Sequence, residues 1–200
     1  MELPGIKNIN TPNLLPKDGE VEFNSHFIEA DHLQELIEQT KWTQDKMNMF
    51  GKVVDLPRLT AWYGDPEASY TYSGITNNPL AWTPLLLNLK KEIETYTGSE
   101  FNSVLLNYYR DQSDHMSWHN DDEKELGHQP VIASLSFGEP RLFQFKHFED
   151  KTIEKISVST EGGSLIIMRG ETQKYWRHRI AKTSLPMGPR VNLTFRKISV

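Results

Sequence analysis

The chain has 200 residues, of which 37% are hydrophobic and 24% charged, and its formal net charge is −5. This size and composition predict one globular domain with a sizeable core, and the absence of cysteine excludes disulfides, thiolate metal sites and a cysteine nucleophile. The acidic balance argues against a protein that coats nucleic acid over a broad surface, since such binding depends on Lys and Arg.

The N-terminal segment is rich in Pro and Gly, at Pro4, Gly5, Pro12, Pro16 and Gly19. We expect residues 1–25 to form an arm without much regular structure, followed by a single domain over 26–200. The segment lacks the basic and apolar regions of a secretory leader, and no run approaches the roughly 18 apolar residues of a membrane span. We therefore expect a monomeric cytoplasmic protein without membrane contact, or a nuclear one in a eukaryotic host.

Two helices are predicted in the first half of the chain. Asp31 can cap a helix whose apolar stripe begins at Leu33, and Thr83-Pro84 opens a second helix that ends before Gly98. From residue 103 onward, short runs rich in β-branched and aromatic residues predict strands at 104–109, 131–137, 142–147, 153–158, 164–168 and 191–198. This spacing favours an α+β, mainly β fold in which helices lie against a double-sheet core, as in a sandwich or jelly roll.

Two histidines and one aspartate are candidate metal ligands, namely His119 and Asp121 in a His-x-Asp motif and the later His178. Two imidazoles and a carboxylate can hold Fe(II) on one face and leave the opposite face open for a co-substrate and O2. The motif alone is weak evidence, because residues two apart in any extended segment project to one side. A lone histidine is more often structural, and we assign that role or a surface position to His115, His128 and His147.

The run from 190 to 196 alternates polar and apolar residues. In a strand, one side would carry Val191, Leu193 and Phe195, and the other side would carry Arg190, Asn192, Thr194 and Arg196. The apolar side argues against a simple solvated strand, and a buried arginine needs an anion. The pattern therefore indicates an anion site.

Several motifs follow one another in a specific order: Leu-Pro-Arg-Leu-Thr-Ala-Trp-Tyr-Gly-Asp at 56–65, Tyr-Thr-Tyr-Ser-Gly at 70–74, Asn-Tyr-Tyr at 107–109, His-Asn-Asp-Asp-Glu at 119–123 and Pro-Arg-Val-Asn-Leu-Thr-Phe-Arg-Lys at 189–197. From about 50 to 198 the chain thereby resembles the AlkB-type Fe(II)/2-oxoglutarate dioxygenases, and among them the DNA-repair homologues that act on duplex DNA. The resemblance implies a double-stranded β-helix, a form of jelly roll, with a catalytic core at about 100–200 and a nucleotide-recognition region with a hairpin at about 45–80.

The resemblance also implies the ligands of both cofactors. Iron would be held by His119, Asp121 and His178. 2-Oxoglutarate is a dianion, to which the planar fork of arginine is suited. Its site would be formed by five residues, with Arg190, Tyr109 and Asn192 at the distal carboxylate and Asn107 and Arg196 at the metal-bound end.

A different set would recognise the nucleotide. By resemblance, Glu123 would accept a hydrogen bond from the exocyclic amino group of the damaged base, while Tyr70 and Tyr72 would line the base pocket, with Tyr72 the stacking residue. Without the resemblance, core packing would be the more frequent role of such tyrosines. Arg58 and Asp65 would stabilise the recognition hairpin or its lid.

Phe50 lies in a Phe-Gly-Lys motif that the duplex-acting homologues carry at a hairpin tip. Its side chain would wedge into the stack that the flipped base has left, which offsets part of the lost stacking. Packing of Phe50 under the preceding helix is nearly as compatible with the sequence.

The implied activity is direct-reversal DNA repair. 1-Methyladenine or 3-methylcytosine would be demethylated oxidatively while 2-oxoglutarate and O2 are consumed, and formaldehyde, succinate and CO2 would be released. One departure concerns the substrate, because Ala181-Lys182-Thr183 stands where the duplex-acting homologues have a basic run, so single-stranded DNA and RNA remain open. Nearby cations could form a local basic patch or be scattered solvated charges: Lys146, Lys174, Arg177, Arg179 and Lys182.

Two alternatives keep parts of this pattern. A 2-oxoglutarate-dependent hydroxylase or demethylase of RNA, protein or a small molecule would share the metal ligands and arginines. A nucleic-acid-binding module that has lost activity would bind damaged DNA without consuming 2-oxoglutarate, although the complete set of metal ligands argues against it.

Overall fold

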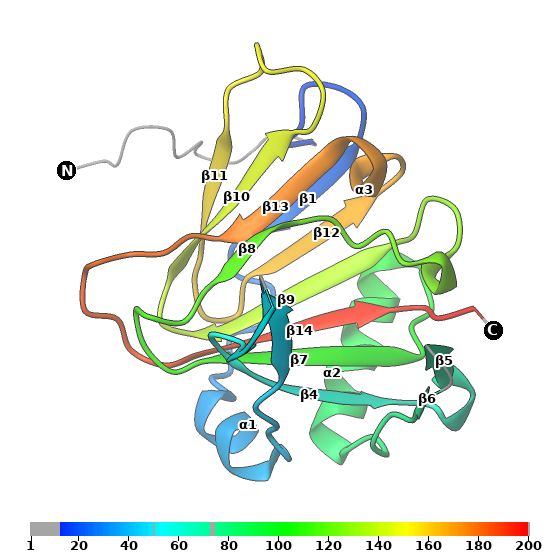
Figure 1. Cartoon of the computed structure of the whole chain (residues 1–200). Helices are drawn as coiled ribbons and strands as arrows, with labels where there is room; N and C mark the ends of the chain where they lie inside the picture. The colour runs from blue at the N-terminus through cyan, green and yellow to red at the C-terminus, as the bar shows by residue number, and fades with distance from the viewer. Residues whose placement is uncertain (1–12, 50, 73–74, 200) are drawn as a thin grey trace.

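The computed structural model describes residues 13–49, 51–72 and 75–199, with the backbone alone for 47–49, 70–72 and 75–77. Two antiparallel sheets form the body of the fold (Figure 1). The larger sheet has the order β1 (Glu20–Asn24), β12 (Leu165–Arg169), β9 (Ile132–Gly138), β14 (Arg190–Arg196), β7 (Ser103–Tyr109) and β4 (Leu59–Gly64). The smaller sheet has the order β11 (Ile156–Thr160), β10 (Arg141–His147), β13 (Trp176–Ile180) and β8 (Met116–His119).

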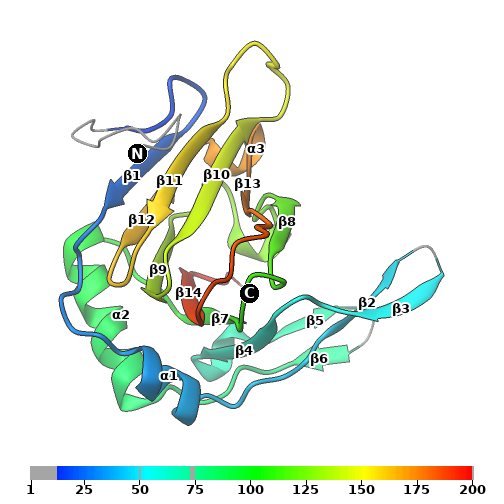
Figure 2. The same cartoon turned by 90° about the vertical axis from the view of Figure 1, so that its left-hand side faces the viewer.

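The helices are few, as predicted, and the two longer ones cover the larger sheet on the side away from the smaller one (Figure 2). They are α1 (Leu33–Gln39) and α2 (Pro84–Thr97), and α3 (Thr172–Tyr175) is a single turn before β13. In α2, Thr83 accepts the backbone N–H of Leu86 at 3.2 Å, and Gly98 ends the helix at φ +65. Within the described chain, no helix is long and apolar enough to cross a membrane.

Two apolar layers fix the position of the sheets. The first lies between the helices and the larger sheet and includes Leu89, Ile93 and Leu193. The second lies between the two sheets and includes Phe145 and Trp176. This mainly β arrangement confirms the predicted fold class and is consistent with a double-stranded β-helix.

Short elements complete the chain. The strands β2 (Lys46–Met49) and β3 (Lys52–Asp55) pair antiparallel and project from the body (Figure 2), and β5 (Tyr70–Tyr72) and β6 (Ile75–Asn77) form a second, smaller hairpin. The 3-10 turns are η1 (Pro66–Ala68) and η2 (Lys124–Leu126). A hairpin is therefore present around the Phe-Gly-Lys motif, although Phe50 itself lies outside the described residues.

The structure departs from the predicted strands at five elements. Residues 20–24, assigned to the irregular arm, form β1 because β12 offers them a pairing edge. The strand predicted at 153–158 begins at Ile156, since Asp150 accepts the backbone N–H and the hydroxyl of Thr152 and holds a turn before it. The sequence did not predict β4, β8 or β13 as strands, and they are short or carry polar residues.

Candidate metal and co-substrate centre

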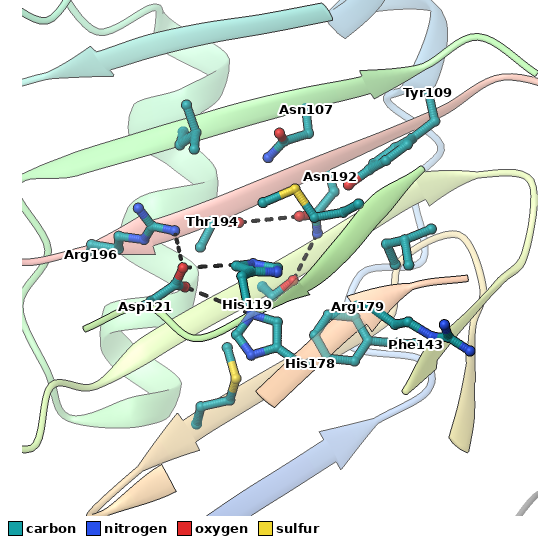
Figure 3. A pocket seen from close by; sticks show the side chains of 15 residues that line it. Asn107, Tyr109, His119, Asp121, Phe143, His178, Arg179, Asn192, Thr194 and Arg196 are labelled. Carbon is teal, nitrogen blue, oxygen red and sulfur yellow. Dashed lines mark hydrogen bonds and ion pairs between the residues drawn. The ribbon is translucent and has the colours of Figure 1, made fainter. Parts of the chain in front are cut away.

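Three side chains converge at the edge of the space between the two sheets (Figure 3). His178 in β13 is the register partner of His119 at the end of β8, and Asp121 follows two residues later. The Nε2 atom of His119 lies 3.8 Å from Oδ1 of Asp121, and the Nε2 atom of His178 lies 4.0 Å from Oδ2. One ligand atom from each residue lies within 4.8 Å of the others, and this is the sole such cluster in the described part of the chain.

The protonation states of His178 and Asp121 suit a divalent metal. Burial lowers the pKa of His178 to about 3, with a further contribution from His119, so its imidazole is neutral at physiological pH. Burial alone would raise the pKa of Asp121, but the charge of the Arg196 guanidinium and its hydrogen bond to the carboxylate outweigh burial and hold that pKa below its ordinary value. Neutral imidazoles and a carboxylate are the forms that bind iron.

Neighbouring groups orient both imidazoles. The Nδ1 atom of His119 is 2.9 Å from the backbone oxygen of Ser117, which it can contact only as a donor, so Nε2 keeps its lone pair for a metal. The ring of Phe143 stacks on His178 with centroids 5.3 Å apart and planes 15° apart. A hydrogen bond therefore restrains the ring of His119, and packing against Phe143 restrains that of His178.

Gln173, in the α3 turn, fixes the loop that carries Asp121. Its side-chain oxygen accepts the backbone N–H of Asp121 at 3.0 Å, and its backbone oxygen accepts the side-chain amide of Asn120 at 2.9 Å. The residue is only 4% exposed. Because α3 leads directly into β13, Gln173 connects the two chain segments that supply the metal ligands.

We expect Gln173→Ala to weaken Fe(II) or Mn(II) binding by about tenfold or more, the usual effect of removing a group that orients a ligand. Anaerobic titration of the metal-free protein measures this directly. Gln34→Ala is the control, since Gln34 is exposed on α1 and its side chain donates a hydrogen bond to Glu38 on the same helix. An unchanged metal affinity in a folded Gln173→Ala variant would show that the loop holds its geometry without this contact.

Arg190 lies at the other end of the site and is 0% exposed. Its Nη2 atom donates to the hydroxyl of Ser136 at 2.9 Å, and its guanidinium lies 5.2 Å from the centroid of the Tyr109 ring. The Nε and Nη1 atoms are buried and have no hydrogen-bond partner among the described residues, and burial lowers the pKa of Arg190 to about 10. Two unsatisfied donors on a buried cation are suited to an anionic ligand such as a carboxylate.

The polar face of β14 lines a cavity beside the triad, and Tyr109, whose ring lies next to the guanidinium of Arg190, is part of that lining. Asn192 donates to the hydroxyl of Ser134 at 2.8 Å and accepts from the hydroxyl of Thr194 at 3.2 Å. The cavity is lined by eight of the polar residues shown in Figure 3, namely Asn107, Tyr109, His119, Asp121, His178, Asn192, Thr194 and Arg196. The alternation predicted for this strand is confirmed.

Arg196 joins this cavity to a second, larger cleft. Its Nη2 atom lies 2.8 Å from Oδ1 of Asp121, and its Nη1 atom lies 3.8 Å from Glu123. Leu105 and Arg196 line both spaces. The second cleft is bounded by β4, β7 and the η2 turn, and four carboxylates line it: Asp45, Asp122, Glu123 and Glu125.

The remaining predicted residues lie at different distances from the centre. Arg58 is in the interior, where its Nε donates to the side-chain oxygen of Asn107 at 2.7 Å. Asp65 accepts the indole N–H of Trp82 at 2.7 Å. The side chains of Tyr70 and Tyr72, and Phe50 as a whole, lie outside the described residues.

Some residues of the site carried no signal in the sequence. Gln173 lies in a four-residue helix, and Ser136 and Thr160, which contact Arg190, occupy ordinary strand positions. Asp45 and Thr60 line the second cleft and hydrogen-bond to each other across 15 residues. These contacts arise from tertiary pairing, so local patterns could not identify them. Asp122 was identifiable, because it stands between two predicted site residues.

A family model described as the 2OG-Fe(II) oxygenase superfamily matches residues 22–196. The chain belongs to this superfamily. The His119–Asp121–His178 cluster fits the iron site of such an oxygenase, because it brings two imidazoles and one carboxylate within reach of a single ion.

Three relatives place this oxygenase in the AlkB family. Alpha-ketoglutarate-dependent dioxygenase alkB homolog 3 of Bos taurus is 38% identical and is aligned over 97% of this chain and 76% of its own length. The homolog 3 of Mus musculus is 44% identical over 85% of this chain and 62% of its own length, so this chain spans less than two thirds of that relative. The DNA oxidative demethylase ALKBH2 of Mus musculus is 39% identical over 83% of this chain and 72% of its own length.

A solved structure, that of OsALKBH1, supports the fold of this oxygenase. It aligns with 88% of this chain and 96% of its own chain at a TM-score of 0.61 and 14% sequence identity. At that identity the likeness concerns the fold alone.

Proposed function

We propose that the protein demethylates N-alkylated bases of DNA, such as 1-methyladenine and 3-methylcytosine, and that it consumes 2-oxoglutarate and O2 and releases succinate, CO2 and formaldehyde. The observation that carries this proposal is the position of Arg196, which contacts a metal ligand on one side and the acidic second cleft on the other. A base held in that cleft would be next to the metal. The names of the relatives, which include a DNA oxidative demethylase, support the same substrate class.

Bound iron with 2-oxoglutarate and O2 supplies hydroxylation of the N-alkyl carbon, after which the carbon leaves the base as formaldehyde. The protein contributes binding and orientation. Arg190 and Tyr109 would bind the distal carboxylate of 2-oxoglutarate, with Asn192 beside them, while Asn107 and Arg196 would lie at its metal-bound end. In this orientation the two unsatisfied nitrogens of Arg190 would acquire their acceptors.

Charge in the second cleft favours a cationic base. 1-Methyladenine and 3-methylcytosine carry a positive charge, and the cleft is lined by more carboxylates than cations. Glu123 would accept a hydrogen bond from the exocyclic amino group of the base. The carboxylate of Glu123 lies 3.8 Å from Nη1 of Arg196, the residue that also contacts Asp121, which supports this role.

We also propose a division of the chain into functional regions. A single dioxygenase domain would include β1 together with residues 26–200, and within it about 45–80 would contact the nucleotide and about 100–200 would form the catalytic core. In the nucleotide region, Tyr72 would stack on the base, Tyr70 would line its pocket, and Phe50 would enter the stack. Arg58 would act through Asn107, to which it donates a hydrogen bond.

The test is anaerobic reconstitution with Fe(II) and 2-oxoglutarate, followed by exposure to air with single- or double-stranded oligonucleotides that contain one 1-methyladenine. Mass spectrometry should show the loss of one methylene from the oligonucleotide together with formaldehyde and succinate. Succinate in the absence of a change in any methylated DNA or RNA would refute the nucleic-acid substrate and favour a hydroxylase of protein or a small molecule. DNA binding without succinate would indicate a binding module.

We expect Glu123→Gln to lower kcat/KM for a cationic methylated base by about ten- to a hundredfold, since a hydrogen bond to a charged group contributes about 1.5–3 kcal/mol. A neutral alkylated base without an exocyclic amino group should be affected much less. Glu92→Gln on α2 is the control, with the same change of charge at an exposed position. Metal affinity is measured in parallel because Arg196 contacts both Glu123 and Asp121, and an equal loss with both bases would exclude direct recognition by Glu123.

A further inference from the structure

The outer face of the smaller sheet carries a cluster of cations and aromatic rings that the proposed chemistry does not use. It consists of Lys146 in β10, Arg177 and Arg179 in β13, Trp118 in β8 and Phe148 after β10, and we call it the basic face. Alternation along the strands explains its composition. The neighbours of Lys146, Arg177 and Arg179 along each strand are buried on the inner face, so these three side chains lie on the outer face.

Ring contacts order the cations of the basic face. The Nζ atom of Lys146 and the guanidinium carbon of Arg179 each lie 4.5 Å from the centroid of the Trp118 ring. The guanidinium carbon of Arg177 lies 4.4 Å from the centroid of Phe148, whose side chain is 44% exposed. Three positive charges are therefore presented on a fixed surface.

Gln144 reinforces this order from beneath. It is 7% exposed, accepts the Nε–H of Arg179 at 2.8 Å, and donates to the hydroxyl of Ser157 at 2.9 Å. The contact leaves the two terminal nitrogens of Arg179 without a protein acceptor in the described chain. An arginine held through Nε and a ring, with its terminal nitrogens available, is arranged to bind a further acceptor.

The basic face has no acidic counterpart. In the chain as described, none of its three cations forms an ion pair, although Lys17, Lys90, Arg110 and Lys197 elsewhere each have a carboxylate partner. Lys146 and Arg177 are direct register partners across the two strands. Burial and then Arg177, Lys151 and Arg179 lower the pKa of Lys146.

Neighbouring like charges repel each other, and this chain has 27 acidic residues against 22 basic ones. If this face only contacted solvent, a single acidic residue among the cations would reduce their repulsion. The concentration of unpaired cations in an acidic protein therefore favours an anionic ligand with several charges over a purely structural role for the ring contacts.

The position of the basic face relates it to the candidate site. Trp118 precedes His119 and Arg179 follows His178, so the same two strands carry metal ligands on one side and the basic face on the other. Arg179 also lines the edge of the metal cavity, and its side chain extends away from Asp121 and Arg196 (Figure 3). The projecting β2–β3 hairpin and the strand β8 lie on the same side of the molecule (Figure 2).

We propose that the basic face binds the sugar–phosphate backbone of the nucleic-acid substrate beyond the target nucleotide. This inference rests on the proposed function. The phosphate contacts would come from β10 and β13, which compensates for the weakly basic Ala181-Lys182-Thr183 segment ahead of β14. Phosphates at regular intervals match the chemistry of the face, where ordered cations lie on adjacent strands.

The test compares the wild type with Lys146→Gln/Arg177→Gln. Fluorescence anisotropy measures binding to unmodified oligonucleotides of about 15 nucleotides, single- and double-stranded, over a range of salt concentrations. Loss of two phosphate contacts should reduce the slope of log affinity against log salt by about 1.4 for single strands or about 1.8 for duplex, and should weaken binding by about tenfold or more at low salt. Lys90→Gln/Lys91→Gln on α2 changes the charge equally and should behave like the wild type.

A second measurement separates the basic face from the active site. The double variant should demethylate a methylated trinucleotide at the wild-type rate, because this substrate carries only the phosphates next to the target base, whereas its kcat/KM for the longer oligonucleotide should fall with the binding. Lys146→Arg/Arg177→Lys keeps the charges and should retain the salt slope. That retention would show that charge, and not altered packing, explains the loss.

Several outcomes would overturn the inference. An unchanged salt slope in the double variant would overturn the proposed role of the basic face. Demethylation by the wild type in the same experiments would leave the proposed function intact. An equal loss with the trinucleotide would show damage to the active site instead. Reduced binding to anionic vesicles or polyglutamate, with unchanged oligonucleotide binding, would assign the face to another partner. If the wild type neither binds nor demethylates any oligonucleotide, both proposals fail.

Discussion

Asp121→Ala is expected to abolish measurable 2-oxoglutarate turnover and to weaken Fe(II) binding by about two to four powers of ten. Asp121 is the one anion of the triad, is 3% exposed, and lies 2.8 Å from the guanidinium of Arg196. Its loss would leave the Arg196 guanidinium without its carboxylate partner beside the two imidazoles, where its positive charge would repel Fe(II). Removal of one member of a buried charge pair costs about 3–5 kcal/mol, which corresponds to this loss of affinity if the penalty appears in metal binding.

Asp121→Asn separates charge from packing, because the amide nearly preserves the volume of the carboxylate. Both variants should lose metal affinity in anaerobic titrations, and both should lose succinate formation in air. His128→Ala is the control, since His128 is exposed and lies outside the triad. Thermal unfolding of the metal-free proteins shows whether each variant is folded. Wild-type metal affinity in a folded Asp121→Asn protein would contradict the assignment of the metal site.

The polar face of β14 could be predicted from the sequence because a strand repeats every two residues. Arg190, Asn192 and Thr194 are buried on one side, as expected, and Leu193 packs in the apolar layer on the other. The ends of α2 were equally predictable, since Thr83 and Gly98 act through local hydrogen bonds and local backbone geometry. Local rules were therefore sufficient wherever the cause was itself local.

The register that forms the metal site could not be derived in the same way. His119 and His178 become partners only when β8 pairs with β13, with a bulge after His178, and a pairing between segments 59 residues apart depends on the whole fold. The resemblance to a family supplied the triad that physical reasoning alone left open. Gln173 shows what neither route identified, because its role depends on where α3 lies relative to the loop at Asp121.

Arg190→Met is expected to raise the KM for 2-oxoglutarate by more than about a hundredfold, and Arg190→Lys by a smaller factor. Lysine keeps the charge but loses the planar fork that binds a carboxylate through two nitrogens. In the wild type, Nε and Nη1 of Arg190 are the donors without partners. Initial rates of succinate formation at varied 2-oxoglutarate measure the effect, and an unchanged KM in the methionine variant would remove Arg190 from the co-substrate site.

The stability of the same variant gives an independent and more specific result. Without 2-oxoglutarate, Arg190→Met should be about as stable as the wild type or more stable, because it removes a buried charge that lacks an anion. Arg141→Met is the matched contrast, since Arg141 is also buried but donates to the backbone oxygens of Asp111, Asp114 and Ala181. Its loss should destabilise the protein whether or not 2-oxoglutarate is present.

Adding 2-oxoglutarate at about a hundred times its dissociation constant to the anaerobic Fe(II) protein should stabilise the wild type by about 2.7 kcal/mol. The increment should be nearly absent in Arg190→Met and largely kept in Arg141→Met. A full increment in Arg190→Met would place the anion elsewhere. Burial of the Arg190 guanidinium costs desolvation free energy, which would be recovered only when a carboxylate binds. The unsatisfied nitrogens therefore make the site selective for an anion over a neutral molecule of similar shape.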